Sequence, residues 1–592
     1  MFVEHPCKVV SELMEAKDRY QILIVVLIFA IALSLRLLGI GWGLPNDWHF
    51  FSYHPDEATI ALCVSLLDIF SLRMNPHHFN YGSLFFYLVY FALLFAVGSG
   101  LVKSQNILSL SFWRDMHIVG RTLNAFIGAS TVFVVWRTAY IAYGGHCALL
   151  SALLIAVLPI HVQHSHFMTI DVSFAFWAMV ALLYSLRALM LSQSGCSERR
   201  QTIGSFMLSG FFGGLSVGTK YGVFLPLCAT WLVASLYIVG AGDQPARQLK
   251  MAMRIAVFNF FLPALAMCLF GFLLVCPYSI LAWNEFIQGV LYEMRHMRMG
   301  HGELFLDTGS GHLYHIRVNL NASLGLPLLI TSAFGIVWAF IKRRPQDVLL
   351  LTFILVYFGI VGCFKVRFAR YLMPIIPPLC ILTANGVCDV FTAVMRANVS
   401  RSFKRIVRCI ITVAFLFVLA YTALYSCAIV RVMILPDTRD LAASWVRKNI
   451  PHGSTIAVAG NPWFYTVPVK PIMAGPYKRY LVGYRFPESK DAKQVKYDIR
   501  ATWFNIEAIK RVGATAFIAT SFEYREFLRL KDKRVSQTMK HLEKLCNGGI
   551  AFEKRFERPF EFLGIKFGPT YIPHDMMYAN PTVRIFVFKE RD

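Results

Sequence analysis

Two adjacent carboxylates are the first residues in the chain whose types and spacing suggest chemistry. They are Asp56 and Glu57, and they directly follow His54 and Pro55 in a segment rich in aromatic residues. A carboxylate in a sheltered cavity gains basicity, because burial disfavours its charged form, and it can then deprotonate a hydroxyl or an amine. Proline and acidic residues also favour the first turn of a helix. The pattern therefore predicts a general base or, as the structural alternative, a helix start.

Four basic residues lie where a charged side chain is either costly or functional. Lys220 stands in a Gly-Thr-Lys-Tyr-Gly sequence between two apolar runs, so its side chain either extends to lipid head groups or holds a phosphate. Arg367 and Arg370 precede another apolar run, where an interfacial anchor is the alternative. Arg121 begins a further run, and a buried guanidinium there requires a carboxylate or phosphate partner. Asp171 is the obvious protein partner, so a structural Arg121–Asp171 pair is an alternative to phosphate binding.

Three histidines precede Asp171 in a His-Val-Gln-His-Ser-His sequence, at His161, His164 and His166. Histidine together with a carboxylate can bind zinc. The spacing matches no standard metal motif, and such clusters more often form the polar lining of a site. We therefore predict no metal site and no required cofactor, with a divalent metal as the alternative.

The composition places these residues in a membrane protein. Of 592 residues, 56% are hydrophobic and only 16% are charged, whereas soluble proteins carry roughly 25% charged residues. The net charge is +24. Excess Lys and Arg in cytoplasmic loops explains this charge without nucleic acid as a partner.

Hydropathy predicts about eleven membrane-spanning helices, since a span requires about 20 apolar residues. The expected spans are 21–40, 117–139, 146–162, 172–191, 203–218, 221–240, 255–279, 324–341, 347–363, 371–394 and 409–430. Two further stretches, 82–102 and 283–300, are expected to be interfacial helices that do not cross.

Loop charge predicts the orientation. If 82–102 lies on the surface, the basic segments at 342–344 and 396–408 fall on the cytoplasmic side, as the positive-inside rule requires. If 82–102 crossed, these clusters would face outwards. We therefore expect a cytoplasmic N-terminus, with all the candidate site residues on the non-cytoplasmic face.

The pattern changes after Leu435. We expect a membrane domain over 1–435 and a soluble, non-cytoplasmic α/β domain over 436–592. The latter begins with a helical pattern, and three short apolar runs, at 455–459, 514–519 and 583–588, are expected to be buried strands. It contains one cysteine, Cys546, so it can form no internal disulfide.

Several short motifs resemble, in order and spacing over roughly residues 20–430, those of the GT-C glycosyltransferase superfamily. The likeness is greatest to the group of protein O-mannosyltransferases and lipid A aminoarabinose transferases. One departure is Tyr81-Gly82, where the aminoarabinose transferases carry Lys-Pro, so one cationic phosphate contact is missing. The matching segments are His54-Pro55-Asp56-Glu57, Asn80-Tyr81-Gly82-Ser83-Leu84, Gly120–Gly128, Thr169-Ile170-Asp171, Gly218–Gly222 and Arg367–Pro374.

The resemblance implies an inverting, mannosyltransferase-like enzyme that moves a hexose or pentose from a polyprenyl-phosphate donor to a protein, lipid or glycan acceptor. It implies that Asp56 is the catalytic base or orients the acceptor, with Glu57 as its support. A departing prenyl phosphate requires cations, for which Lys220 and Arg370, with Arg121 and Arg367, are the candidates. The residues expected to complete the polar lining are His54, Tyr81, Asp171 and His166.

Two other classes of function stay open at this point. One is a transporter or flippase without sugar transfer, although such proteins often show repeated halves and the sequence has no repeat. The other is a structural partner in an envelope assembly. The scarcity of disulfide-forming cysteines and the tail domain favour a multi-pass protein of a prokaryotic inner membrane.

Overall fold

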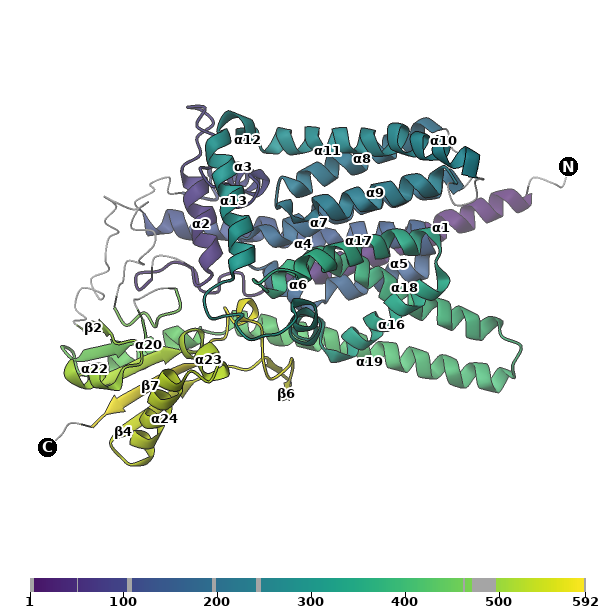
Figure 1. The fold of residues 1–592 in the computed structure, drawn as a ribbon. Helices are drawn as coiled ribbons and strands as arrows, with labels where there is room; N and C mark the ends of the chain where they lie inside the picture. Colours follow the sequence, from purple (N-terminus) through teal and green to yellow (C-terminus); the bar gives the residue numbers. More distant parts are fainter. Residues whose placement is uncertain are drawn as a thin grey trace.

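Long apolar helices lie side by side in a bundle in the computed structural model (Figure 1), which describes residues 5–49, 52–103, 109–193, 199–240, 246–460, 464–470 and 497–589. The longest are α1, α4 and α19, of 33, 34 and 34 residues. The bundle helices are α1 (His5–Leu37), α4 (Leu110–Tyr143), α5 (Gly145–Ala156), α7 (Ile170–Gln193), α8 (Arg199–Val217), α9 (Phe224–Ile238), α10 (Ala246–Ala256), α11 (Leu262–Val275), α16 (Leu326–Lys342), α17 (Pro345–Gly362), α18 (Ile376–Arg396) and α19 (Arg401–Ile434).

Eight of the described helices are long and apolar enough to cross a membrane, or nine if Gly311–Leu324 and Leu326–Lys342, which meet at a bend of 118°, form one broken span. This count is lower than the eleven predicted. The run 146–162 is divided because α5 ends at Ala156 and Pro159 begins the short helix α6 (Pro159–His164).

The other shortfall is the run 203–218, whose helix α8 is rich in Ser and Gly and therefore less apolar. Its glycines serve packing: a Cβ on Gly210 would lie 2.0 Å from the Ala264 carbonyl oxygen, and one on Gly214 would lie 2.2 Å from that of Cys268. Such close backbone approach is typical of helix pairs inside membranes. Helix α8 is therefore a core helix between α7 and α11.

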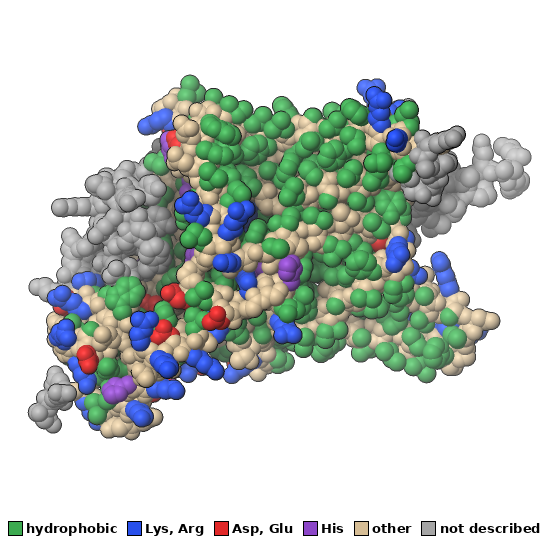
Figure 2. Space-filling model, viewed as in Figure 1, with side chains coloured by type: hydrophobic (Ala, Val, Ile, Leu, Met, Phe, Trp, Pro, Cys, Tyr) green, Lys and Arg blue, Asp and Glu red, His purple; other side chains and the backbone are tan. Residues whose placement is uncertain are grey.

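Short helices gather at one end of the bundle. They include α2 (Pro55–Ser65), α3 (Leu84–Gly98) and α13 (Trp283–Met299), and α13 runs across the ends of the long helices (Figure 1). With 15 residues, α3 is shorter than a span requires, which agrees with the prediction for 82–102. Hydrophobic side chains cover the visible face of the bundle, and Lys and Arg appear at both of its ends and on the C-terminal domain (Figure 2). Which end faces the cytoplasm stays a prediction.

The C-terminal sheet domain lies at the same end as α13. The predicted strands are confirmed, and they form the centre of a five-stranded sheet of order β2-β1-β3-β7-β4. Strand β1 pairs in parallel with β2 and β3, and β7 runs antiparallel to β3 and β4. The strands are β1 (Thr455–Val458), β2 (Asp498–Ala501), β3 (Ala516–Thr520), β4 (Ala551–Phe556) and β7 (Val583–Phe588), with a separate hairpin of β5 (Glu561–Phe562) and β6 (Ile565–Lys566).

Helices cover this sheet and connect it to the bundle. Buried residues of α20 (Thr438–Asn449) pack on the sheet in one cluster, and residues around α24 (Lys533–Asn547) pack on it in another. The remaining helices are α22 (Ile506–Arg511) and α23 (Ser521–Arg529). The predicted domain boundary at 435/436 falls between α19 and α20.

Candidate active site

A cavity of about 360 Å³ opens at the end of the bundle, where α2, α7, α13 and the C-terminal domain meet. Three carboxylates and two cations line it, together with histidine and tyrosine side chains. The charged lining residues are Asp56, Asp171, Lys220, Glu293 and Arg370. The cavity thus contains half of the ten site residues that the sequence indicated, from segments more than 300 residues apart.

Asp56 reaches the cavity because α2 begins just before it. Pro55 is the first helical residue, and Asp56 and Glu57 lie in the first turn, so the predicted helix start is correct. The same turn divides the two acids: the Asp56 side chain is 36% exposed towards the cavity, whereas Glu57 points into the protein and is fully buried. The two adjacent carboxylates therefore have different surroundings.

Arg370 is the centre of the charge network. It lies in a 3₁₀ turn, η5 (Ala369–Ile375), before α18. Its Nη2 is 3.0 Å from Asp56 Oδ2, its Nε is 3.7 Å from Asp171 Oδ2, and its Nη1 is 4.0 Å from Asp575 Oδ2. The guanidinium also lies 4.2 Å from the centre of the Phe368 ring. Three carboxylates from three different segments thus surround one cation at the cavity wall.

Lys220 is the second cation of the cavity. Its Nζ donates to Asp171 Oδ1 at 2.8 Å and lies 4.5 Å from the centre of the Tyr371 ring. The backbone is extended at Lys220 after α8 ends, and the segment before it binds the loop of Gly82. Gly82 N donates to Thr219 O at 3.2 Å, and a Cβ at position 82 would lie 2.0 Å from the Gly218 carbonyl oxygen. Glycine is therefore required at position 82.

Glu57 and Arg121 form a buried structural pair. Arg121 Nε and Nη2 donate to the two Glu57 oxygens at 2.8 and 2.7 Å, and both side chains are at most 1% exposed. Glu57 also accepts from Met168 N at 2.7 Å and from the Ser52 hydroxyl. Burial raises the pKa of Glu57, but the attraction of Arg121 outweighs it and holds this pKa at about 2.

The partner of Arg121 therefore differs from the expected Asp171, which instead pairs with Lys220. The remaining donor of Arg121, Nη1, is bound by the carbonyl oxygens of Ile40 and Trp42, at 2.7 and 2.6 Å. All these contacts are with protein atoms away from the cavity. Arg121 and Glu57 thus hold the segment between α1 and α2 in place.

Two other expected site residues also lie away from the cavity. Arg367 Nη1 donates to Thr308 Oγ1 at 2.5 Å and to Gly309 O at 2.8 Å, so it fixes the loop before α14 (Gly311–Tyr314). Both ring nitrogens of His166 lie 2.8 Å from backbone carbonyl oxygens, those of Val162 and Leu38. Both residues serve local structure.

The last two expected lining residues differ from each other. Tyr81 does line the cavity and lies against His78, with ring centres 4.9 Å apart. His54 does not line the cavity. It is buried between Phe167 and Tyr578, and the centre of its ring lies 4.5 Å from the centre of each of theirs. Burial lowers the pKa of His54 to about 4, so His54 is neutral at physiological pH.

The three histidines before Asp171 do not converge on a common point. His161 Nδ1 lies 2.9 Å from Arg36 Nη2, His164 Nε2 lies 4.0 Å from Asp575 Oδ2, and His166 binds carbonyl oxygens. Across the described ranges, no group of three or more His, Cys, Asp or Glu side chains has the arrangement of a metal site.

Helix α13 contributes residues that the sequence assigned only to an interfacial helix. Glu285 binds His77 at 2.8 Å, and Gly289, one turn later, sits against the backbone of Phe79, where a Cβ would lie 2.7 Å from its carbonyl carbon. Glu293 follows one further turn along the same face and lines the cavity. Burial raises the pKa of Glu293, against the attraction of Lys220 and Arg370.

The C-terminal domain supplies a further set that sequence reasoning missed. Asp575 and Tyr578 lie between Arg370 and the sheet domain, and Tyr578 lines the cavity. Asp575 lies in the short turn η7 (His574–Met576) and Tyr578 follows it, some 200 residues after Arg370, so only the tertiary fold brings them to the site. The local signal was a Pro-His-Asp sequence, which ends eight residues before the strand β7.

Comparison with known proteins indicates what this arrangement resembles. Residues 108–273, which include Arg121, Asp171 and Lys220, match the family described as dolichyl-phosphate-mannose-protein mannosyltransferase. This match confirms the resemblance that the motifs indicated. No curated protein sequence matches the chain.

Solved membrane enzymes show a weak likeness of fold. The apo oligosaccharyltransferase of Archaeoglobus fulgidus is 16% identical, with 81% of this chain covered and a TM-score of 0.48; this chain spans 61% of its length. ArnT from Cupriavidus metallidurans in the apo state is 16% identical, with 84% of this chain and 92% of its own covered and a TM-score of 0.47. The arabinofuranosyltransferase AftD from Mycobacteria is 13% identical, with 96% and 40% covered and a TM-score of 0.42.

Proposed function

We propose that this chain is a membrane glycosyltransferase that moves a sugar from a polyprenyl-phosphate donor to a hydroxyl or amine of a protein, lipid or glycan. One observation carries the proposal. Within a single cavity at the end of an apolar helix bundle, an accessible carboxylate, Asp56, lies beside two cations, Lys220 and Arg370. These are the groups that the transfer of a sugar from a lipid phosphate requires. The family match, whose description names dolichyl-phosphate mannose, supports mannose as the first sugar to test.

In this mechanism Lys220 and Arg370 bind the donor phosphate. As the bond between the anomeric carbon and the phosphate oxygen breaks, its electron pair goes to that oxygen, and the phosphate gains a negative charge. Cations fixed at this position stabilise the transition state more than they stabilise the bound donor. Arg370 is suited to this role because a guanidinium can donate two parallel hydrogen bonds to a phosphate.

Asp56 orients the acceptor from the opposite side of the sugar. Its carboxylate accepts the hydroxyl or amine proton while the acceptor atom attacks the anomeric carbon, so the configuration inverts. The acid formed at Asp56 later loses this proton to water. No cofactor takes part in these steps. The cavity opens at the end of the bundle that we place outside a prokaryotic inner membrane, with the N-terminus in the cytoplasm and the C-terminal domain outside.

The test begins with the protein itself. It is purified in detergent, and co-purified lipids are identified by mass spectrometry; a bound polyprenyl-phosphate sugar identifies the donor. The protein is then incubated with polyprenyl-phosphate [³H]mannose, or with the labelled donor so identified, in the presence of membranes from the same source. We expect labelled product from the wild type and none from Asp56→Asn, which still binds donor. Repeated absence of both co-purified donor and labelled product would overturn the proposal.

The same variant distinguishes a transporter or flippase. Such a carrier would form no glycosylated product with either protein, and Asp56→Asn would change only the movement of label across vesicle membranes. Labelled product that depends on Asp56 therefore excludes the carrier reading.

A further inference from the structure

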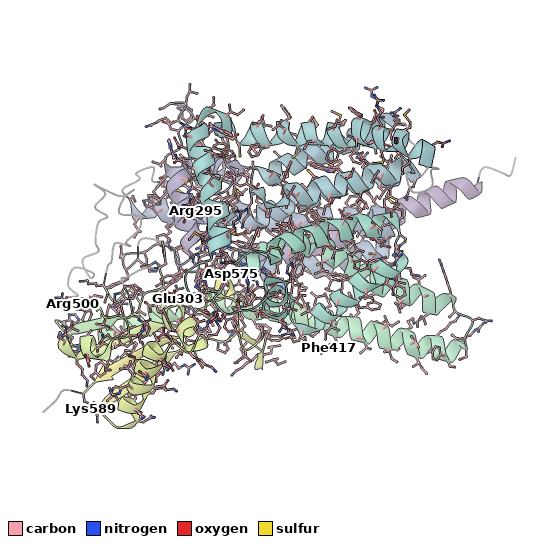
Figure 3. The ribbon with its side chains drawn as sticks, viewed as in Figure 1. Arg295, Glu303, Phe417, Arg500, Asp575 and Lys589 are labelled. Carbon is pink, nitrogen blue, oxygen red and sulfur yellow. The ribbon has the colours of Figure 1, made fainter. Side chains whose placement is uncertain are left out.

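A carboxylate of the C-terminal domain holds the backbone at Arg370. Asp575 lies in the short turn η7 (His574–Met576) and is fully buried. Its Oδ1 accepts from the backbone N–H of Ala369 at 3.1 Å, and its Oδ2 accepts from that of Arg370 at 2.9 Å. Figure 3 labels Asp575 where the C-terminal domain meets the ends of the bundle helices.

These two N–H groups are the first of the 3₁₀ turn η5. The first N–H groups of a helix have no partner inside it, and a buried one must find a partner elsewhere. The residue before the turn, Phe368, supplies no side-chain cap. Asp575 fills this role from 205 residues away. The position of Arg370 therefore depends on a residue of the C-terminal domain.

The segment that carries Asp575 is itself fixed from both sides. From the bundle, Gln163 Nε2 donates to Met576 O at 2.7 Å. From the tail, Arg439 Nη2 donates to Tyr578 O at 2.7 Å. Arg370 Nη1 in turn lies 3.4 Å from the Tyr578 hydroxyl. The segment thus connects the sheet domain rigidly to the cavity wall.

We propose that Asp575 is a positioning residue for the donor phosphate: by holding the backbone of Ala369 and Arg370, it aims the Arg370 guanidinium into the cavity. The C-terminal domain is then part of the donor site. This inference rests on the proposed function, and it assigns a role to a domain that the chemistry above does not use.

Asp575 has two opposing effects on phosphate binding by Arg370, so its removal could strengthen or weaken that binding. Its negative charge, 4.0 Å from Arg370 Nη1, weakens the attraction of Arg370 for a phosphate. Its hydrogen bonds to the backbone keep Arg370 in place. The second effect is the larger, because both oxygens bind N–H groups at about 3 Å, and because Arg370 has a closer counterion in Asp56, at 3.0 Å. Removal of Asp575 should therefore weaken phosphate binding.

The experiment measures the affinity of the purified full-length chain for undecaprenyl phosphate and for dolichyl phosphate in detergent, by native mass spectrometry. We expect Asp575→Asn to bind roughly tenfold more weakly, which corresponds to about 1.4 kcal/mol, and Asp575→Ala more weakly still. The matched control is Glu553→Gln, which breaks the Glu553–Arg584 pair in the same domain, at 2.7 and 2.9 Å. It should stay within about twofold of the wild type, since losses at independent sites do not couple.

A double-mutant cycle separates positioning from general loosening of the fold. In an Arg370→Gln background, Asp575→Asn should cause no further loss, because Asp575 acts through Arg370. Additive losses, or an affinity that is unchanged or tighter in Asp575→Asn, would overturn the inference. Should Asp575→Asn fail to fold, Gln163→Leu removes the hydrogen bond to Met576 O that holds the segment of Asp575; a wild-type affinity in that variant would contradict the inference.

The outcomes also separate this inference from the proposed function. If the wild type transfers label and binds undecaprenyl phosphate, and Asp575→Asn binds it with the same affinity, only the role of Asp575 is overturned. A wild type that binds neither lipid phosphate and forms no labelled product overturns both. In the transfer assay, Asp575→Asn should raise the donor KM and still form product, whereas Asp56→Asn should form no product although it still binds the lipid phosphate.

Discussion

Replacement of Glu57 by Gln should destabilise the protein without removing its donor site. The substitution keeps the shape of the side chain but removes its charge, so the buried guanidinium of Arg121 loses its counterion. Breaking a buried pair in this way typically costs about 3–5 kcal/mol. The pKa of Glu57 gives an independent value: its drop from the ordinary 4.5 to about 2 corresponds to about 3 kcal/mol at neutral pH. The two values agree because both describe the same carboxylate–guanidinium contact.

The assay is thermal unfolding of wild type and Glu57→Gln in the same detergent, at a series of pH values. Since the folded-state pKa is the lower one, the stability that Glu57 contributes is present above pH 4.5 and is lost as the pH falls towards 2. The wild type should therefore lose its advantage over Glu57→Gln in that window. Asp68→Asn is the matched control from the same outer loop, since Asp68 pairs with an exposed Arg73 and such pairs contribute about 0–1 kcal/mol.

The refuting result is equally specific. If Glu57→Gln unfolds at the wild-type temperature but forms no glycosylated product, Glu57 acts in the chemistry and its assignment to structural support is wrong. If Glu57→Gln unfolds at a much lower temperature than the wild type but binds undecaprenyl phosphate with wild-type affinity in the cold, Glu57 supports the structure and Asp56 alone serves the site, as the structure indicates.

Three further predictions concern the cavity wall. Lys220→Gln should weaken undecaprenyl phosphate binding by about tenfold or more, the loss of one charged hydrogen bond, whereas Arg367→Gln should leave this affinity within about twofold, as native mass spectrometry can measure. Protonation of Glu293, whose pKa is raised, removes a negative charge beside the phosphate site; the affinity of the wild type relative to that of Glu293→Gln should therefore rise as the pH falls from neutral towards 4.5. The titration of the lipid phosphate itself, whose second pKa is about 6, affects both proteins and cancels in this ratio. Gly289→Leu should displace α13, because its Cβ would meet the Phe79 backbone at 2.7 Å, and transfer should fall while the unfolding temperature changes by only a few degrees.

The sequence predicted the helical membrane architecture well because its signals are local. The apolar runs and the strands at 455–459 and 583–588 can each be recognised from neighbouring residues. The eleven predicted spans exceed the eight or nine described helices that are long and apolar enough to cross, and the difference lies where an apolar run is broken or less apolar. In 146–162 the apolar run continues through Pro159, which ends one helix and begins another, and no hydropathy average registers that break.

The sequence predicted part of the candidate site but not its pairings. Asp56, Asp171, Lys220 and Arg370 do meet in one cavity. Arg121 pairs with Glu57, and the alternative pair with Asp171 does not form, because the choice of partner depends on which face of α2 each acid occupies. One residue of difference, between Asp56 and Glu57, turns a side chain by about 100° around a helix. The sequence alone does not show which of the two acids faces the cavity.

The pairings have a consequence for how the cavity binds its donor. Without donor, Asp56 and Asp171 serve as counterions of Arg370 and Lys220, and cations this buried would be costly without them. A donor phosphate competes for the same two cations. Under the proposed function, the phosphate takes hydrogen bonds of Arg370 that Asp56 accepts in its absence, which frees a carboxylate oxygen for the acceptor proton. Asp575 keeps the Arg370 backbone fixed during this exchange, so the guanidinium can change partners without leaving the cavity wall.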